Sequence, residues 1–477
     1  GLAWAHAEDD FETIQKAYLA GNNLLSKLLG IKGAGADFLT QFIGSDELIN
    51  DLYESKISIE YKKILEAYSQ GINRFAELNP DKVLIKELFP LNPKKLLKYA
   101  QLQLFVSSEG DSWINKIIKN DLKYQVVDQS NNLYSNEETR GSNVFGFNSS
   151  RTKDGNTYLA INTHQPLDGP VSWYEAHLSS EEGTNILGAL FAGSPHVLIG
   201  ANENIAWSHT VNRPDKTDVF ALEMHPKFKK KYRVDDNYYD LEEYKASIFI
   251  KILGIPIKIK RKYYKSIYGP TLKNNSGYYS IRTPSLFEIR AMEQWWRMGK
   301  AKNFTEFYNI IKKNSLPGYN IGYADKNDTI FYISNGLIPK RKDGYDWKNV
   351  VPGNTKKTLW TEMYNTEELP QVIQPKSGYF YNANHSPFLS TSKNENPKKD
   401  SFSKNMGFET YNNNRSTRLY DLIEEKKELD YNDFKKIKYD NSLPNPLSYS
   451  WMDINALFDI NPNRYPEISN ILIQIQK

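Results

Sequence analysis

The sequence contains no cysteine, and this absence excludes three kinds of chemistry. Without cysteine the chain can form no disulfide framework, no thiolate metal site and no cysteine nucleophile. It also lacks the apolar run of about 18 residues that predicts a transmembrane helix, and it shows no signal-peptide pattern. The net charge of +4 is small for 477 residues, so we expect neither nucleic acid nor a membrane as a partner.

The residues that are present indicate a folded protein. Hydrophobic residues make up 39% of the chain and aromatic residues 13%, including 32 tyrosines. A content of this kind argues against intrinsic disorder. A chain of 477 residues is also too long for one ordinary core, so we expect two or more lobes.

The first third of the chain has a helical pattern. Apolar residues recur every three or four positions over Asp9–Leu29 and Glu47–Leu78, with few helix breakers. A third helix is predicted over Pro93–Ser107. The apolar spacing then decays into a segment of Asn, Ser and Glu, which is typical of an exposed loop. We therefore predict a helical region over residues 1–120 and a linker over residues 121–141.

The pattern changes to strands after this linker, and we assign residues 142–477 to a β-rich unit. One part of this unit, from about residue 225 to about residue 290, is rich in Lys and Tyr. Apolar and polar residues alternate there, as they do in a strand. We interpret this part as a β insertion with a solvated basic face rather than as a nucleic-acid site. Strands are further predicted at 143–147, 157–161, 172–178, 185–191, 322–338 and 378–382, a strand, a turn and a second strand over 197–207, and helices at 288–314 and 417–438. This order predicts the α+β class with a layered core.

Ser142 lies at the boundary between the two regions, in the stretch Gly-Ser-Asn-Val-Phe-Gly-Phe (141–147). Gly-Ser-Asn alone is ordinary turn chemistry. A serine hydroxyl needs a base to act as a nucleophile, and none of the seven histidines accompanies a Gly-x-Ser-x-Gly elbow. Alternatively, the serine becomes the first residue of a new chain, and its own α-amine is the base. Gly141 suits the required cleavage, because glycine tolerates the strained backbone in which Oγ attacks the preceding carbonyl.

Several stretches carry a resemblance to a known family. They are Gly-Ser-Asn-Val-Phe-Gly-Phe-Asn-Ser-Ser-Arg-Thr (141–152), Ala-Ile-Asn-Thr-His (160–164), Trp-Tyr-Glu-Ala-His-Leu (173–178), Gly-Ser-Pro-His-Val-Leu-Ile-Gly (193–200), Asn-Ile-Ala-Trp-Ser-His-Thr-Val (204–211) and Asn-Ala-Asn-His-Ser-Pro (382–387). In order and spacing they resemble the β chain of the penicillin acylase family, which are N-terminal-nucleophile hydrolases. Residues 1–15 and 66–73 resemble the helical α chain of that family. The resemblance implies an αββα four-layer sandwich, self-cleavage between Gly141 and Ser142 into a paired α and β chain, and hydrolysis of a small N-acyl amide.

The resemblance also assigns catalytic roles to five residues. Ser142 resembles the nucleophile, and His164 falls where the family has His or Gln beside it. His is typical there of the acyl-homoserine-lactone and cephalosporin acylase branches. Val211 matches the residue whose backbone N–H forms half of the oxyanion hole, and Asn384 matches the residue whose side-chain amide forms the other half. Arg415 resembles the arginine that supports the site around the nucleophile's amine.

Read without the family, three of these residues have simpler interpretations. His164 is then a hydrogen-bonded histidine at a strand end, and Arg415 is an exposed surface residue. Asn384 is a turn residue, and the neighbouring Asn382 competes for its assignment.

Two further residues, Gln165 and Trp173, are assigned to substrate binding by the same resemblance. Gln165 departs from the family, because an apolar or aromatic residue is common at that position of the acyl pocket. This departure argues against a long apolar acyl group. Phe145 also departs, because tryptophan is frequent there.

The resemblance implies a structural calcium ion and no organic cofactor. Asp215 and Asp218, with the backbone carbonyl of Thr217 between them, resemble the family's calcium-binding turn, and Glu109 resembles a ligand from the α side. Carboxylates and a carbonyl suit a hard cation. The alternative is a solvated acidic turn.

The ends of the chain differ from the family's precursors, which have a targeting segment before the part matching Gly1 and continue beyond the part matching Lys477. We therefore expect a fragment that lacks both ends, and the resemblance places the protein in the periplasm or outside the cell. The substrate alternatives are acyl-homoserine lactones, β-lactam side chains and penicillin G. Two alternatives from other classes are a non-catalytic binding protein that kept the fold and a secreted carbohydrate-binding β protein.

Overall fold

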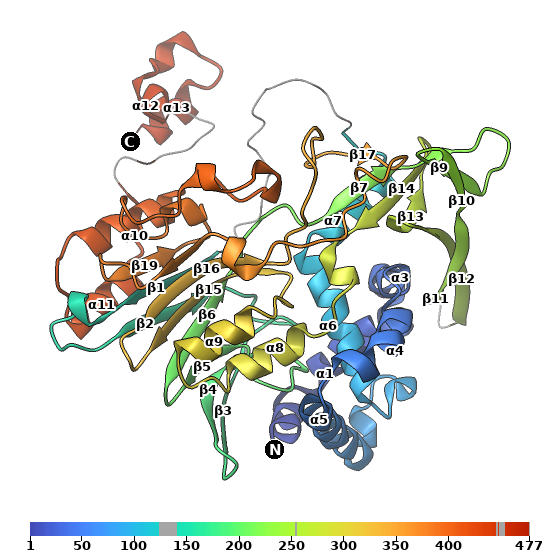
Figure 1. Ribbon diagram of the computed structural model, residues 1–477, viewed down its shortest axis with the longest axis horizontal. Coiled ribbons are helices and arrows are strands. Elements are labelled where there is room, and N and C mark those ends of the chain that lie inside the picture. Colours follow the sequence, from blue (N-terminus) through green and yellow to red (C-terminus); the bar gives the residue numbers. More distant parts are fainter. Residues whose placement is uncertain (124–140, 253–254, 445–446, 448–453, 477) are drawn as a thin grey trace.

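Two β-sheets that face each other form the centre of the computed structural model (Figure 1). The structure describes residues 1–123, 141–252, 255–444, 447 and 454–476. The small sheet has the strand order β19-β1-β2, and the large sheet has the order β18-β16-β15-β6-β5-β4-β3. Their strands are β1 (Ser142–Phe147), β2 (Tyr158–Thr163), β3 (Tyr174–Ser180), β4 (Thr184–Leu190), β5 (Ile199–Asn202), β6 (Ile205–Thr210), β15 (Gly318–Asp325), β16 (Ile330–Gly336), β18 (Gln371–Ile373) and β19 (Tyr379–Asn382).

The alternating directions of the side chains of β1 explain why the small sheet packs against another layer on each of its faces. Successive side chains of a strand point to opposite faces. Val144 packs in a buried cluster with Tyr332 of the large sheet, whereas Phe145 and Phe147 pack with helical residues on the other side. The two sheets approach closely at Gly322, where a Cβ would lie 2.5 Å from Cγ2 of Val144.

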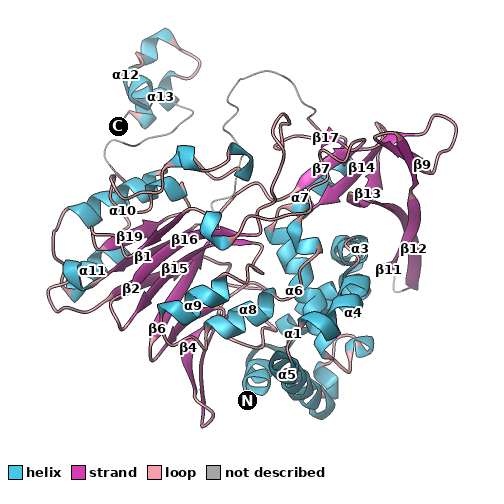
Figure 2. Cartoon of the chain, in the orientation of Figure 1, coloured by secondary structure: helices cyan, strands magenta, loops and turns pink. Residues whose placement is uncertain are grey.

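Helices cover the outer faces of both sheets (Figure 2). The large sheet packs against α8 (Ala291–Met298) and α9 (Phe304–Ile311) through a buried cluster that contains Trp207 and Trp295. The small sheet packs against α10 (Asn414–Glu424) and α11 (Tyr431–Tyr439). The layers therefore follow the order helix, sheet, sheet, helix, and the predicted αββα sandwich is confirmed.

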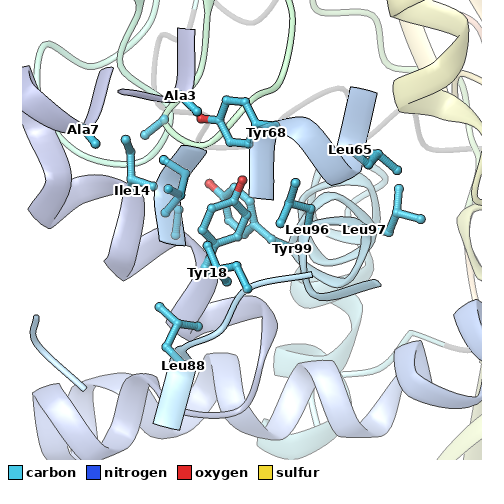
Figure 3. Close-up of a cluster of buried hydrophobic side chains, with 14 of the residues drawn as sticks. Ala3, Ala7, Ile14, Tyr18, Leu65, Tyr68, Leu88, Leu96, Leu97 and Tyr99 are labelled. Carbon is cyan, nitrogen blue, oxygen red and sulfur yellow. The ribbon is translucent and has the colours of Figure 1, made fainter. Parts of the chain in front are cut away.

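The helical region before the sheets has its own buried core (Figure 3). Tyr18, Tyr68 and Tyr99 meet at its centre, each less than a tenth exposed. The helix α6 coincides with the predicted range. The helices are α1 (Leu2–Gly21), α2 (Leu25–Leu29), α3 (Ala34–Phe42), α4 (Ser45–Lys56), α5 (Ile59–Leu78), α6 (Pro93–Ser107) and α7 (Gly110–Lys119).

Several predicted long helices are interrupted in the structure, and side-chain caps account for the breaks. Ser58 accepts a hydrogen bond from the backbone N–H of Tyr61 at 3.2 Å, so a new helix begins inside the predicted range 47–78. Asn303 starts α9 and Asp430 starts α11 in the same manner. A side-chain oxygen at this position satisfies a backbone N–H that the helix leaves unpaired, and it favours a new start over a continuous helix.

A second β unit is built mainly from the segment between β6 and β15 of the large sheet. Its main sheet has the order β11-β12-β13-β14-β7-β17, and a smaller sheet has the order β10-β9-β8. Ile248 of the hairpin β11–β12 packs in the same buried cluster as Phe38 and Phe42 of α3. The strands are β7 (Asp218–Ala221), β8 (Glu223–Met224), β9 (Lys231–Val234), β10 (Asn237–Asp240), β11 (Glu242–Ile252), β12 (Ile255–Ser266), β13 (Gly269–Lys273), β14 (Tyr278–Arg282) and β17 (Val351–Pro352).

The last described elements are α12 (Ile454–Asp459) and α13 (Ser469–Ile475), which lie away from the sandwich in Figure 1. Most of the predicted linker, residues 124–140, lies outside the described residues. Among the helices that the structure describes, none is both long enough and apolar enough to cross a membrane.

Candidate active site

Ser142 is the first residue of β1, the middle strand of the small sheet, and Gly141 directly precedes it. Ser142 pairs with Thr163 of β2, and the backbone N–H of His164 donates to the Gly141 carbonyl at 3.2 Å. This last bond extends the pairing of the two strands by one step beyond β1. The bond between Gly141 and Ser142 is therefore held in a fixed backbone conformation, and the Ser142 side chain is fully buried.

Both functional groups of Ser142 have defined partners. Its backbone N–H donates to Oδ1 of Asn384 at 2.5 Å, and its hydroxyl donates to the Gly141 carbonyl at 2.7 Å. The nitrogen that would become an α-amine after cleavage thus already contacts a side-chain acceptor. The hydroxyl lies beside the carbonyl of the bond that would be cut.

Asn384 joins Ser142 to Val211. Its side-chain N–H donates to the Val211 carbonyl at 2.9 Å, and its backbone adopts a left-handed conformation with φ of 60°. Asn382 has a different task, because it is fully buried and its Oδ1 accepts from the Thr210 hydroxyl at 2.6 Å and from the Asn384 N–H at 2.9 Å. The structure therefore brings Asn384, and not Asn382, to Ser142 and Val211.

Arg415 lies in the first turn of α10 and points back toward β1. Its guanidinium donates to the Ser142 carbonyl at 3.0 Å, to the Ala383 carbonyl at 3.1 Å and to Oδ1 of Asn384 at 2.9 Å. It also donates to the side chain of Asn143. Burial lowers the pKa of Arg415 from its ordinary value. The interpretation of this residue as an exposed surface arginine does not agree with these contacts.

His164 lies beside the same peptide bond, with a side chain that solvent reaches. A Cβ on Gly141 would come within 3.0 Å of Nδ1 of His164 and within 3.0 Å of Nη2 of Arg415. The pKa of His164 is lowered from 6.5, first by partial desolvation and then by the charge of Arg415. The neutral imidazole is therefore favoured at neutral pH.

An apolar cavity of about 400 Å³ opens beside these residues, and His164, Gln165, Trp173 and Val211 are on its wall. Trp173 stacks on Phe191 with ring centroids 4.4 Å apart and donates to the Thr163 carbonyl at 3.0 Å. The sequence did not predict most of the wall, which comes from both regions of the chain. Other residues of the wall are Leu65, Leu97, Leu104, Val106, His209, Met292, Trp295 and Tyr319.

A buried carboxyl group that the sequence did not predict supports the segment after Val211. Oε1 of Glu409 accepts a hydrogen bond from the backbone N–H of Arg213, whereas its Oε2 is buried without a hydrogen-bond partner. Burial raises the pKa of Glu409 to about 7, against the opposing charges of Lys216 and Arg213. No local motif could have identified Glu409, because its partners are distant in sequence.

The four residues predicted to bind calcium lie at the junction of the helical region and the second β unit. The Thr217 hydroxyl donates to the Ser108 carbonyl at 2.5 Å. Asp215 and Asp218 are both close to Arg341, at 3.4 Å and 2.9 Å. The pKa of Asp215 is raised by burial, lowered by Arg341, and raised by the charges of Asp218 and Glu109. Calcium binding stays a prediction, and the donor set fits it poorly because an arginine already lies between the two carboxylates.

Comparison with known proteins identifies the family. The family model described as penicillin amidase matches residues 1–450. The acyl-homoserine lactone acylase PvdQ of Pseudomonas fluorescens (strain Pf0-1) is 22% identical over 372 residues, which are 71% of this chain and 47% of that protein. The aculeacin-A acylase of Actinoplanes utahensis is 26% identical over 208 residues, which are 42% of this chain and 26% of that protein.

A solved structure agrees with the fold. The thermostable penicillin G acylase from Alcaligenes faecalis superimposes with a TM-score of 0.53 and 22% sequence identity, over 62% of this chain and 51% of that chain. The chain spans about half the length of the relatives that it matches over most of its own length, at 47% and 48% of the first two. The family model covers nearly the whole chain, and this chain therefore belongs to the penicillin amidase family.

Proposed function

We propose that this chain is the catalytic part of a self-processing amidohydrolase in which Ser142 is the N-terminal nucleophile. One observation carries the proposal: the side-chain amide of Asn384 contacts both the Ser142 nitrogen and the Val211 carbonyl, beside an apolar cavity. A side chain that only stabilised its own turn would not join these two residues, because Ser142 lies in β1 of the small sheet and Val211 directly follows β6 of the large sheet. An amidohydrolase needs the nucleophile, the oxyanion donors and the acyl pocket at one place.

The processing step would begin with the attack of the Ser142 Oγ on the Gly141 carbonyl carbon. The C–N bond between Gly141 and Ser142 breaks, the hydroxyl proton passes to the released nitrogen, and an ester to Oγ forms. Water then hydrolyses this ester and leaves a carboxylate on Gly141. The backbone N–H of His164, 3.2 Å from the Gly141 oxygen, is placed to stabilise the negative charge on that oxygen.

The hydrolysis of substrate would use the α-amine that processing releases. The Ser142 Oγ attacks the amide carbonyl of the substrate, and the free α-amine takes the hydroxyl proton and gives it to the leaving amine. The Val211 N–H and the Asn384 amide hold the oxyanion, which requires the Asn384 N–H to leave the Val211 carbonyl. Water then releases the acyl group. Model α-amines have a pKa of about 7.7–8.0, and the positive charge of Arg415 would lower it.

The cavity and the relatives together suggest the substrate class. The wall is mostly apolar, so the acyl group is expected to be apolar, and Gln165 adds one polar contact on that wall. Related proteins are described as acylases of acyl-homoserine lactones and of penicillin G. We propose an N-acyl amide of this kind, hydrolysed by a paired α and β chain in the periplasm or outside the cell. The alternative is a relative that kept the fold and lost catalysis, and processing separates the two.

The experiment compares the wild-type chain with Ser142→Ala by intact mass and N-terminal sequencing. We expect the wild type to give a new N-terminus that reads Ser-Asn-Val-Phe, and Ser142→Ala to stay in one piece. Ser180→Ala, at the exposed end of β3, is the matched control and should be processed as the wild type is. The processed chain is then assayed with N-acyl amides of different acyl length. A wild-type chain that stays uncut, or a Ser142→Ala chain that is cut at the same bond, would contradict the proposal.

A further inference from the structure

The junction where the family resemblance implies calcium contains a buried arginine. The side chains of Arg341 and Asp218 are both fully buried, and Nε of Arg341 donates to Oδ2 of Asp218 at 2.9 Å. Nη2 of Arg341 lies 3.4 Å from Oδ1 of Asp215. Nη1 donates to the backbone carbonyls of Asp215 and Asn405, each at 2.8 Å. One guanidinium thus contacts oxygen atoms of three residues, from the turn of Asp215 and Asp218 and from the separate segment around Asn405.

The environment of this guanidinium resembles the coordination shell of a cation. A calcium ion in proteins is surrounded by carboxylate and carbonyl oxygens, and Arg341 has both kinds around it. Arginine is suited to such a position, because its planar group makes several directed hydrogen bonds and stays charged when buried. Trp360 donates to the same oxygen of Asp218 at 2.6 Å, which further stabilises that carboxylate.

The same oxygens are poorly available to a metal ion. A calcium ion takes about six to eight oxygen ligands at short distance. Oδ2 of Asp218 and the backbone carbonyls of Asp215 and Asn405 already accept hydrogen bonds from Arg341. Oδ1 of Asp215 lies 3.4 Å from the guanidinium, and Oδ1 of Asp218 is buried without a hydrogen-bond partner. Within residues 1–123 and the other described ranges, no group of three His, Cys, Asp or Glu side chains is arranged to hold a metal. Two like charges from a guanidinium and a divalent ion would also repel each other in this buried space.

We propose that Arg341 is a built-in cation that takes the place of calcium at the turn of Asp215 and Asp218. It neutralises the fully buried carboxylate of Asp218 and the partly buried carboxylate of Asp215, and it joins β7, the segment around Asn405 and the turn after β6. Through the bond from Thr217 to Ser108, the same turn contacts the end of α6 in the helical region. The junction between the two regions is therefore stable without a metal ion. This inference does not depend on the proposed function, because it concerns stability and not turnover.

The first test measures the melting temperature of the wild-type chain with excess EDTA and with excess calcium chloride. We expect the melting temperatures in EDTA and in calcium chloride to coincide. We also expect isothermal titration with calcium chloride to give the same result for the wild type and for Asp218→Asn, so that no calcium binding depends on Asp218. A wild-type chain that calcium stabilises and EDTA destabilises, with the effect lost in Asp218→Asn, would overturn the proposal. The readout needs no active enzyme, so a failure of catalysis leaves it interpretable.

The second test replaces the guanidinium itself. Arg341→Met removes the ion-pair partner of Asp218 and Asp215, and breaking a buried ion pair raises the unfolding constant by roughly 150- to 5000-fold. Arg341→Lys keeps the charge and should lose less, because it loses only part of the hydrogen bonds. Arg74→Met is the control, since Arg74 forms an exposed pair with Glu77 at 3.2 Å. Urea unfolding would overturn the proposal if Arg341→Met were as stable as Arg74→Met.

Discussion

The contacts of Asn384 give the sharpest prediction, because its amide and its backbone make separable contributions. The side-chain amide of Asn384 forms hydrogen bonds with Ser142, Val211 and Arg415, whereas the backbone of Asn384 adopts φ of 60°. Asn384→Ala and Asn384→Gly remove the same amide, but only alanine places a Cβ on a left-handed backbone. The two variants therefore share a loss of function and differ in stability.

The magnitudes follow from these two contributions. Loss of one oxyanion donor lowers kcat by about 10²–10³-fold, or roughly 3–4 kcal/mol. The left-handed conformation costs an L-residue roughly 1–2 kcal/mol, and asparagine and glycine tolerate it better than alanine does. Asn384→Gly should thus be more stable than Asn384→Ala by about 1 kcal/mol, although both are equally poor catalysts.

The assay has two parts, which are turnover of an N-acyl amide by the processed chain and urea unfolding of each variant. Equal loss of kcat in both variants, with a higher unfolding midpoint for glycine, would support the assignment. Turnover that survives in either variant would show that Asn384 is not an oxyanion donor. Equal unfolding midpoints would show that the left-handed backbone at this position carries no strain.

Three further predictions concern the surroundings of Ser142. Gly141→Ala should slow processing, because its Cβ would come within 3.0 Å of both His164 and Arg415, and the rate of appearance of the new N-terminus measures the effect; an unchanged rate would mean that these side chains move aside. Arg415→Gln should raise the pKa of His164, because the charge of Arg415 helps to lower it. NMR titration measures this pKa, and the His164→Gln variant identifies the resonance of His164. An unchanged pKa in Arg415→Gln would mean that the charge has no effect. Burial raises the pKa of Glu409 in the folded chain to about 7, above its ordinary 4.5. As the pH rises from the lower to the higher value, the free energy of unfolding should therefore fall by about 3 kcal/mol. Glu409→Gln should flatten the dependence of the urea midpoint on pH, and an unchanged slope would assign it to other groups.

Local pattern was sufficient for most elements of the fold. The helix over Pro93–Ser107 begins where Asn92 caps it and proline occupies the first turn, and both signals are readable in the sequence. The break at Ser58 was missed, because a serine inside an apolar repeat is compatible with a continuous helix. Its side chain caps a new helix only because tertiary packing turns the chain there.

The candidate site was predictable in part, for a physical reason. Residues near the nucleophile in sequence, such as Gly141 and His164, directly flank the adjacent strands β1 and β2, so their spacing carries information. Glu409 and Arg341 act on partners more than a hundred positions away, as for the bond between Arg341 and Asp218. Such contacts leave no local pattern, and only the folded chain reveals that these residues are buried near the site or the junction.

The position of β1 in the small sheet has a consequence for the nucleophile after cleavage. A chain terminus is ordinarily the most mobile part of a protein. Ser142 would become a terminus inside a strand that has β2 on one edge and β19 on the other, so cutting the peptide bond removes a covalent constraint without removing the strand pairing. The strand pairing therefore prevents most of the gain in conformational entropy that a free chain end would have. The new α-amine is fixed in orientation from the moment of its release.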